Sequence, residues 1–208
     1  DPRTKDITVL QLLQHRSGLR AKLLSWWLLP RADQRGEILR LAAPPGADWP
    51  EAGSYLYSNV GYAIAGHLAE KLDGQTWETL LEKRLFRPLK ITAGQGPAGT
   101  EGKEDQPWPH DSKGQPLPVN GPGCDNPPSL GPAGRVHASL ENYARFAADQ
   151  LRGAAGQPAL LPTALYKILH TPDPISHYAC GWGLADRPWA GGRCLTHTGS
   201  NNAGRPAY

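Results

Sequence analysis

Two tripeptides carry side chains that suit acyl-transfer chemistry, Tyr57-Ser58-Asn59 and His197-Thr198-Gly199. When a serine hydroxyl attacks an ester or amide, a second group must take the hydroxyl proton and later return it to the leaving group. A tyrosine with an ordinary pKa of about 10 is a poor base at neutral pH, so its phenolate needs neighbouring cations. No serine of this chain is followed by lysine three positions later. A serine followed by lysine one helical turn later would supply both a nucleophile and a cation, so this sequence contains Tyr57 without such a pair.

The other members of the two tripeptides suit a supporting role. Asn59 offers both a hydrogen-bond donor and an acceptor, although asparagine is also a preferred N-cap residue of helices. We expect His197, Thr198 and Gly199 to lie on an exposed edge strand, where glycine lets a substrate approach the backbone closely. A histidine carries a full positive charge only part of the time near neutral pH, so it anchors a carboxylate less firmly than lysine does. This favours ester or peptide substrates over β-lactams.

Local signals predict the helices that position these residues. A capping box of Thr8 and Gln11 begins the first helix, and Gly18 is expected to end it in the left-handed conformation. Ser58 or Asn59 caps the next helix, whose apolar residues recur every four positions. That stripe consists of Val60, Ile64, Leu68 and Leu72, widened by Ala65 and Ala69, while Gly61 and Gly66 permit close packing.

Three more helices and two strands follow along the chain. Thr76 caps a helix that buries Trp77, Leu80, Leu81 and Leu85 and ends at Pro88. Ser139 caps another, with Tyr143, Phe146, Ala147 and Leu151 inward, and Pro162 begins a short one with Leu165, Ile168 and Leu169. Residues 178–185 and 193–198 read as strands joined by a turn around Pro188 and Gly191-Gly192. Helices in the middle and strands late indicate an α+β fold.

Residues 94–134 contain 18 glycines and prolines, which exclude a long helix or a central strand. We interpret this stretch as a rim loop, packed by Trp108, Pro109, His110 and Leu117, within one partial domain that spans residues 1–208. Four of the seven tryptophans, Trp26, Trp27, Trp108 and Trp182, are candidates for a substrate pocket, although large aromatic residues more often belong to the core.

Composition narrows the class of protein. The net charge is only +3 and the basic residues are scattered, which argues against nucleic-acid binding. No apolar stretch reaches the length of about 18 residues that spans a bilayer. Cys124, Cys180 and Cys194 show no C-x-x-C spacing and the histidines no metal-binding spacing, so we expect no metal and no cofactor. Cys180 and Cys194 could face each other across a hairpin, but we favour unpaired thiols, since pairing does not follow from spacing alone. No acidic pair stands in a motif typical of a glycosidase.

Five segments, in order, carry a resemblance to a known family. They are Ile7-Thr8-Val9-Leu10-Gln11-Leu12-Leu13-Gln14-His15-Arg16-Ser17-Gly18-Leu19, Tyr57-Ser58-Asn59-Val60-Gly61-Tyr62, Leu85-Phe86-Arg87-Pro88-Leu89, Pro132-Ala133-Gly134 and His197-Thr198-Gly199-Ser200-Asn201. This series resembles the serine β-lactamase-like superfamily, and within it the branch of class C β-lactamases, esterases and D-amino-acid peptidases. The related class A enzymes carry a comparable set of S-x-x-K, S-D-N and K-T-G motifs. The match begins after the place of the family's Ser-x-x-Lys, so we interpret the chain as an internal fragment.

The resemblance implies a function and roles for the site residues. The family acts through an acyl-enzyme on small-molecule esters, amides or peptides, with Tyr57 and His197 at catalytic positions. Asn59, Thr198, Gly199 and Ser200 fall at substrate-binding positions, and the Ser200 amide would stabilise the oxyanion. Two alternatives stay open: a non-catalytic member that binds peptidoglycan-like ligands or serves as a scaffold, and a class C-type β-lactamase. The family relationship also implies a periplasmic or secreted protein.

Overall fold

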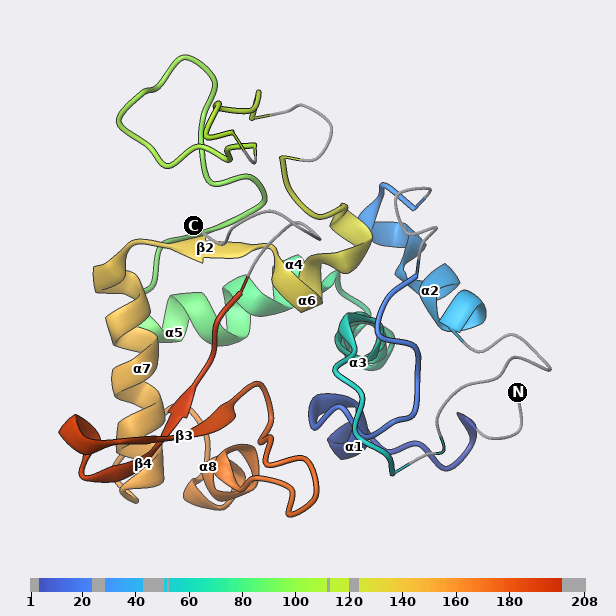
Figure 1. Ribbon diagram of the computed structural model, residues 1–208, viewed down its shortest axis with the longest axis vertical. Helices are drawn as coiled ribbons and strands as arrows, with labels where there is room; N and C mark the ends of the chain where they lie inside the picture. Colours follow the sequence, from blue (N-terminus) through green and yellow to red (C-terminus); the bar gives the residue numbers. More distant parts are fainter. Residues whose placement is uncertain are drawn as a thin grey trace.

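The computed structural model describes residues 4–23, 29–42, 51, 53–111, 113–119 and 124–199. Within these ranges, helices make up most of the regular structure, and four short strands come in two pairs (Figure 1). The elements are α1 (Val9–Leu13), η3 (Ala32–Gln34), α2 (Arg35–Ala42), α3 (Asn59–Asp73), α4 (Trp77–Leu81), η4 (Glu82–Phe86), α5 (Arg87–Leu89), β1 (Ala93–Gln95), η5 (Pro128–Leu130), α6 (Gly131–Gly134), β2 (Val136–Ala138), α7 (Leu140–Ala154), α8 (Thr163–His170), β3 (Gly183–Arg187), η6 (Pro188–Ala190) and β4 (Gly192–Thr196). The predicted α+β class is confirmed.

The main core lies where α1, α2 and α3 meet. Its buried members come from these three helices, from the segment after α1 and from η5. They are Leu12, Leu19, Leu23, Leu29, Ile38, Ala42, Val60, Ala63, Ile64 and Leu130. Apolar burial of this kind is the dominant favourable term in folding, so this core fixes the position at which α3 begins.

Both sheets are antiparallel pairs. In one, Ala93 of β1 faces Ala138 of β2. In the other, Gly183 of β3 faces Thr196 of β4. The predicted strands 178–185 and 193–198 were too long, because Tyr178 forms only an isolated bridge to Gly183 and the left-handed Gly181 interrupts the extended chain between them. His197, Thr198 and Gly199 therefore follow the end of β4 and do not lie on a strand as we expected.

The capping box that begins α1 is confirmed, since the Gln11 amide donates to the Thr8 hydroxyl and the Gln11 side chain accepts from the Thr8 amide. The predicted end at Gly18 was wrong. The helix ends at Leu13, and the left-handed residue after its cap is His15, with φ of 57°. Gly18 is also left-handed but lies in the following loop, so the glycine was assigned to the wrong turn.

Helix α3 is capped by Ser58, whose hydroxyl accepts from the Gly61 amide at 3.0 Å, so Asn59 is the first helical residue and not the cap. Val60 and Ile64 are buried as predicted. Leu72 is not, with 90% of its side chain exposed, because the last turn of α3 extends past the core that α1 and α2 cover. Gly66 does permit close packing: a Cβ there would lie 2.2 Å from the Pro132 ring of α6.

The region after Thr76 is one helical run with a π-helical turn in it. Thr76 caps α4 as predicted, and the chain continues through η4 into α5. Pro88 does not end the helix as we expected: it lies within α5, two residues after the π-helical turn of η4. The left-handed Lys90 ends the run, and Phe86 is its most deeply buried side chain.

Helix α7 is capped by Ser139 as predicted, but its inward face is different. Tyr143 and Leu151 are exposed, by 51% and 72%. The face toward α8 is formed instead by Asp149 and Gly153, because the Tyr166 ring approaches so closely that a Cβ on Gly153 would lie 2.2 Å from it. The Tyr166 hydroxyl donates to the Asp149 carboxylate, which satisfies both buried polar groups.

A buried arginine connects α2 to α3 and α4. The Arg35 guanidinium is fully buried and pairs with the carboxylates of Glu70 and Glu78. It also donates to the Pro128 carbonyl at 2.8 Å and lies over the Trp77 ring. These contacts hold η5, and with it α6, against α3.

The Gly/Pro-rich stretch contributes β1, η5 and α6 at its ends, and its middle projects from the body of the molecule (Figure 1).

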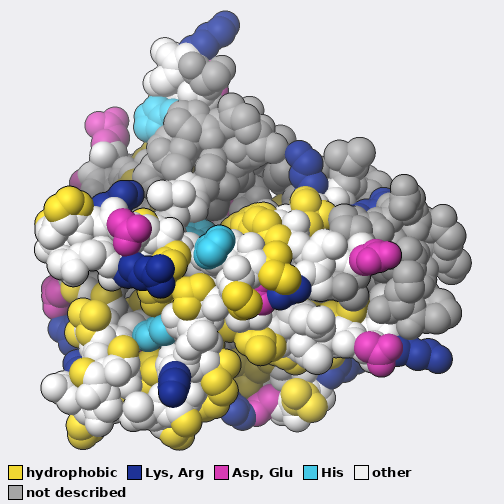
Figure 2. Space-filling view, turned by 60° about the horizontal axis from the view of Figure 1, so that its bottom comes forward, with side chains coloured by type: hydrophobic (Ala, Val, Ile, Leu, Met, Phe, Trp, Pro, Cys, Tyr) yellow, Lys and Arg dark blue, Asp and Glu magenta, His cyan; other side chains and the backbone are white. Residues whose placement is uncertain are grey.

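On the face in Figure 2, basic side chains stand singly among hydrophobic and acidic ones. Within the described ranges, no helix is both long enough and apolar enough to span a membrane. Cys124, Cys180 and Cys194 are free thiols.

Candidate functional site

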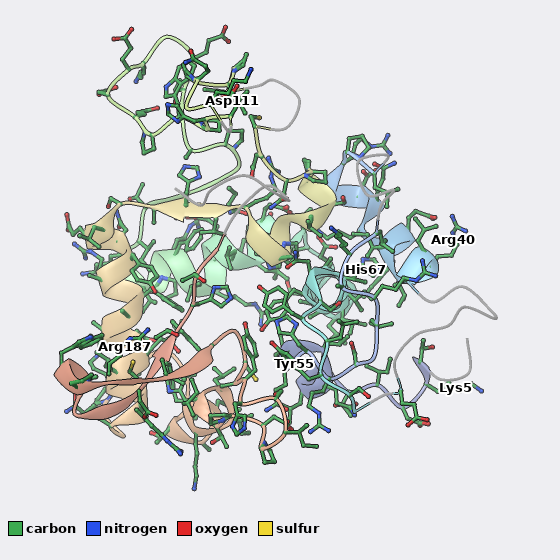
Figure 3. The ribbon with its side chains drawn as sticks, viewed as in Figure 1. Lys5, Arg40, Tyr55, His67, Asp111 and Arg187 are labelled. Atoms are coloured by element: carbon green, nitrogen blue, oxygen red, sulfur yellow. The ribbon has the colours of Figure 1, made fainter. Side chains whose placement is uncertain are left out.

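The segment that delivers Tyr57 is attached to the loop after α1. Tyr55, at the centre of this segment, lies close to α1 (Figure 3). Several hydrogen bonds join the segment to residues 15–21, among them Gly53 N–H to Arg16 O (2.8 Å), Leu56 N–H to His15 O (2.9 Å), Ser58 Oγ to Arg20 O (2.6 Å) and Asn59 N–H to Ala21 O (3.0 Å). The first and second family-like segments of the sequence thus form one unit in space.

A second anchor comes from the C-terminal part of the chain. The Arg16 guanidinium donates to the Gly53 carbonyl at 2.7 Å and also to the Asp173 carboxylate, which is nearly buried. Asp173 in turn accepts from the amides of Ile175 and Ser176, just before Tyr178. Arg16 therefore holds the Tyr57 segment against the segment that carries Tyr178.

Tyr57 and His197 meet across the site. The Tyr57 hydroxyl lies 3.4 Å from His197 Nε2, at the long end of hydrogen-bonding distance. They lie beside a cavity of about 180 Å³, whose lining residues come from the segment before α3, from α3 and α6, and from the segments before and after the β3–β4 hairpin. These residues are Tyr57, Asn59, Tyr62, Pro132, Ala133, Tyr178, Gly181 and His197.

Partial burial favours the uncharged form of both groups. It raises the pKa of Tyr57, and the neighbouring Tyr55 adds to that effect. Partial burial also lowers the pKa of His197. No lysine or arginine is among the described residues that line the cavity. Tyr57 is therefore in place to give or accept a hydrogen bond, but this environment does not produce the phenolate that a base requires.

The remaining predicted residues are placed as follows. Asn59 lines the cavity. Thr198 and Gly199 are exposed beyond it, and the space where a Gly199 side chain would stand is open, so the backbone there is accessible. Ser200, Trp26 and Trp27 lie outside the described residues.

The other two tryptophans do not line the cavity beside Tyr57. Trp182 stacks on Phe146, with ring centroids 6.3 Å apart. Trp108 lies in the projecting segment, where its indole N–H donates to the Lys103 carbonyl at 2.8 Å. A structural role explains both.

His15 is the residue that sequence reasoning missed. Its side chain is 1% exposed and is surrounded by the rings of Tyr57, Tyr62 and Tyr178, at centroid distances of 4.0, 5.1 and 4.6 Å. Burial and the nearby His197 lower the pKa of His15 to about 4. The only signal in the sequence was its place in the Ile7–Leu19 segment, and that segment does not indicate which residues His15 contacts.

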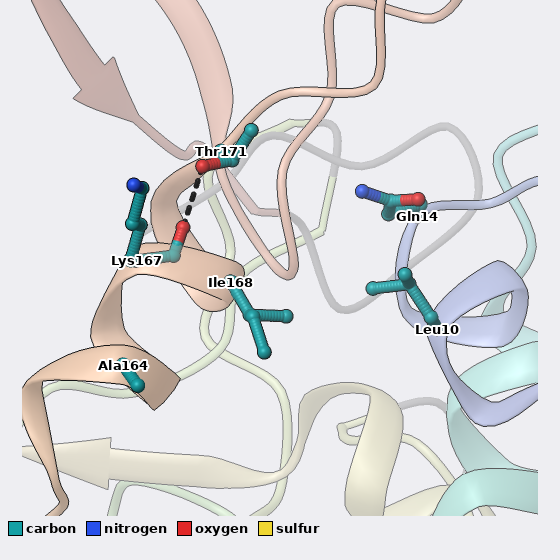
Figure 4. A pocket seen from close by; sticks show the side chains of 6 residues that line it. All are labelled: Leu10, Gln14, Ala164, Lys167, Ile168 and Thr171. Carbon is teal, nitrogen blue, oxygen red and sulfur yellow. Dashed lines mark hydrogen bonds between the residues drawn. The ribbon is translucent and has the colours of Figure 1, made fainter.

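A second cavity, of about 340 Å³, lies between α1 and α8 (Figure 4). Its walls include the aliphatic side chains of Leu10, Ala164 and Ile168. The Thr171 hydroxyl, at the end of α8, donates a hydrogen bond to the Lys167 carbonyl. The cavity contains no acid–base pair. In the ranges that the structure describes, no group of histidine, cysteine and acidic side chains is arranged to hold a metal ion.

Comparison with known proteins identifies the class to which this fold and site belong. The model of the beta-lactamase family matches residues 1–207, so the chain is a member of the beta-lactamase family. Penicillin-binding protein 4 of Amycolatopsis lactamdurans is 28% identical over 191 residues, which cover 86% of this chain and 49% of that protein.

Two solved structures share the fold. The D-stereospecific amidohydrolase from Streptomyces sp. superposes with a TM-score of 0.70 at 22% identity, over 93% of this chain and 61% of its own. The D-amino acid amidase from Ochrobactrum anthropi SV3 does so with a TM-score of 0.68 at 20% identity, over 97% and 59%. The chain thus spans only part of each relative, and the predicted β-lactamase-like fold is confirmed.

Proposed function

We propose that this chain is part of a serine hydrolase that acts on an ester or amide through an acyl-enzyme. The observation that carries the proposal is the meeting of Tyr57 and His197, which lie far apart in sequence, at 3.4 Å beside a cavity that also contains Asn59. Membership of the beta-lactamase family and the amide-cleaving names of two structural neighbours support the same reaction class.

In this proposal the residues divide the steps of the reaction among them. The attacking serine and its lysine come from a segment outside these 208 residues, since the sequence contains no Ser-x-x-Lys. That lysine supplies the positive charge that the cavity lining lacks and so allows Tyr57 to accept the serine proton. Asn59 holds the substrate carbonyl and the lysine, the backbone at Gly199 and Ser200 receives the developing oxyanion, and His197 orients the Tyr57 hydroxyl.

The lining favours uncharged substrates. Pro132, Ala133 and three tyrosine rings offer apolar surface, while partial burial lowers the pKa of His197 and so favours its neutral form. A substrate carboxylate would find no fixed positive charge among the described lining residues. Neutral esters and amides therefore fit this cavity better than penicillins do.

A second candidate is a family member that binds a peptidoglycan-like amide without cleaving it. It is favoured by the neutral state of both Tyr57 and His197, which suits binding by hydrogen bonds better than proton abstraction.

Covalent labelling distinguishes the two candidates. We would express the 208-residue chain and, separately, the complete reading frame that contains it, and treat both with a fluorophosphonate and a fluorescent penicillin. The hydrolase proposal expects the longer product to be labelled and to cleave p-nitrophenyl esters, and the short chain to do neither. A folded longer product that binds an amide ligand but is neither labelled nor active would support the non-catalytic candidate. Labelling of the short chain would refute a nucleophile outside it.

A further inference from the structure

His15 occupies a backbone position that ordinarily selects glycine. After α1, the Arg16 amide donates to the Gln11 carbonyl at 2.7 Å and the His15 amide to the Leu12 carbonyl at 3.3 Å. This pair of bonds is the Schellman motif, whose left-handed residue is usually glycine. His15 takes that conformation with φ of 57°. A side chain held in a disfavoured conformation is a reason to ask what it does there.

His15 contacts the residues on both sides of Tyr57. The His15 carbonyl accepts from the Leu56 amide, and His15 Nδ1 accepts from the Ser58 amide, each at 2.9 Å. The imidazole ring also lies 4.0 Å from the Tyr57 ring, tilted by 37°. One residue thus fixes the backbone before Tyr57, the backbone after it and one face of its ring.

The Ser58 bond also selects the tautomer of the ring. Because Nδ1 accepts a hydrogen bond, the neutral imidazole carries its proton on Nε2. This Nε2 is buried and has no hydrogen-bond partner among the described residues. A buried donor without a partner is costly, so the contacts that favour this ring position are the Ser58 bond to Nδ1 and the packing against Tyr57.

We propose that His15 is the positioning residue of Tyr57: as the neutral Nε2–H tautomer it holds the tyrosine ring so that its hydroxyl stays beside His197 and the cavity. The inference rests on the proposed function, in which Tyr57 accepts the serine proton. His15 touches neither substrate nor the reacting atoms. Displacement of a reacting group by about 1 Å can lower a rate a hundredfold, which is why such a residue matters.

Two substitutions separate the contacts that His15 makes. His15→Asn keeps an acceptor near the position of Nδ1 and suits the left-handed backbone, but removes the ring. His15→Phe keeps a ring and removes the acceptor. The matched control is His177→Asn, since His177 is an exposed histidine with nearly the same backbone conformation, φ of 53°.

The test uses one readout on this chain and one on the complete reading frame. Nitrogen NMR of the histidine side chains should show Nε2 of His15 protonated and Nδ1 unprotonated at pH 7. In ester hydrolysis by the complete product, both His15 variants should lower kcat by about tenfold to a hundredfold with KM within about twofold, whereas His177→Asn should change neither. Should His15→Phe not fold, His15→Asn alone decides the test.

The outcomes also separate this inference from the proposed function. If Tyr57→Phe lowers kcat while folded His15→Asn leaves it unchanged, the positioning role is wrong and the proposed function stands. If Tyr57→Phe itself has no effect, the proposed function fails. Protonation of Nδ1 in the NMR measurement, or equal loss of activity in the His177→Asn control, would also overturn the role of His15.

Discussion

Lowering the pH should destabilise this protein through His15. Burial and the nearby His197 lower the pKa of His15 from 6.5 to about 4. The native ring therefore stays neutral over an interval in which the unfolded chain takes up a proton. Stability must fall as the pH falls, beginning near 6.5 and ending near 4, because the unfolded state binds more protons there.

The size of the effect follows from the width of that interval. Each pH unit across which only the unfolded chain is protonated contributes about 1.4 kcal/mol, so the interval costs about 3 kcal/mol. Small domains have a total stability of only about 5–15 kcal/mol. This single buried histidine is thus expected to remove a substantial part of the stability at pH 4.

The assay is urea unfolding at half-unit steps from pH 7 to 4, for the wild type and for His15→Asn. The variant lacks the titrating ring, so the wild type should lose about 3 kcal/mol more than the variant over this range. His170 and His197, whose pKa values burial also lowers, add losses of the same sign, but these are common to both proteins and largely cancel. His177→Asn serves as the control and should follow the wild type.

Parallel stability curves for the wild type and His15→Asn would refute this reasoning. They would mean that His15 is solvated enough to titrate normally in the folded protein, which contradicts its burial among the tyrosine rings. A wild type that becomes more stable as the pH falls through 6.5 would contradict the sign of the effect.

Two further predictions concern charge. Arg35→Ala should lower the free energy of unfolding by about 3–5 kcal/mol, because it leaves the carboxylates of Glu70 and Glu78 without their partner, whereas Arg40→Ala at an exposed pair should cost at most about 1 kcal/mol. Urea unfolding measures both, and equal effects would mean that the buried cluster contributes no more than a surface pair. In the complete reading frame, His197→Lys should raise the ratio of kcat/KM for a penicillin to that for a neutral ester by about tenfold, with a gain that salt weakens. An unchanged ratio would place His197 outside substrate recognition.

The sequence predicted the beginnings of the helices well because a cap is a local arrangement. Thr8, Thr76 and Ser139 each cap the helix expected of them. The sequence predicted the burial of apolar residues less well. Leu72 and Leu151 share the spacing of a buried stripe, but spacing shows only which residues share a face, and not whether another element covers it.

The sequence predicted some residues of the site and missed another. The resemblance brought Tyr57, Asn59 and His197 together, and the structure places all three at one cavity. His15 was missed because its importance depends on a left-handed backbone that sequence rules assign to glycine, so Gly18 was chosen instead. Its partners, the amides of Leu56 and Ser58, are backbone groups that no side-chain motif reveals.

The central claim is that Tyr57 transfers the proton in an acyl-transfer reaction, and Tyr57→Phe in the complete reading frame tests it most directly. The substitution removes the hydroxyl that lies 3.4 Å from His197 and keeps the ring that packs on His15. We predict that kcat for a short p-nitrophenyl ester falls about a hundredfold or more, the usual contribution of a positioned acid–base group, while KM changes little. An unchanged kcat would contradict the account and leave Tyr57 with a structural role alone.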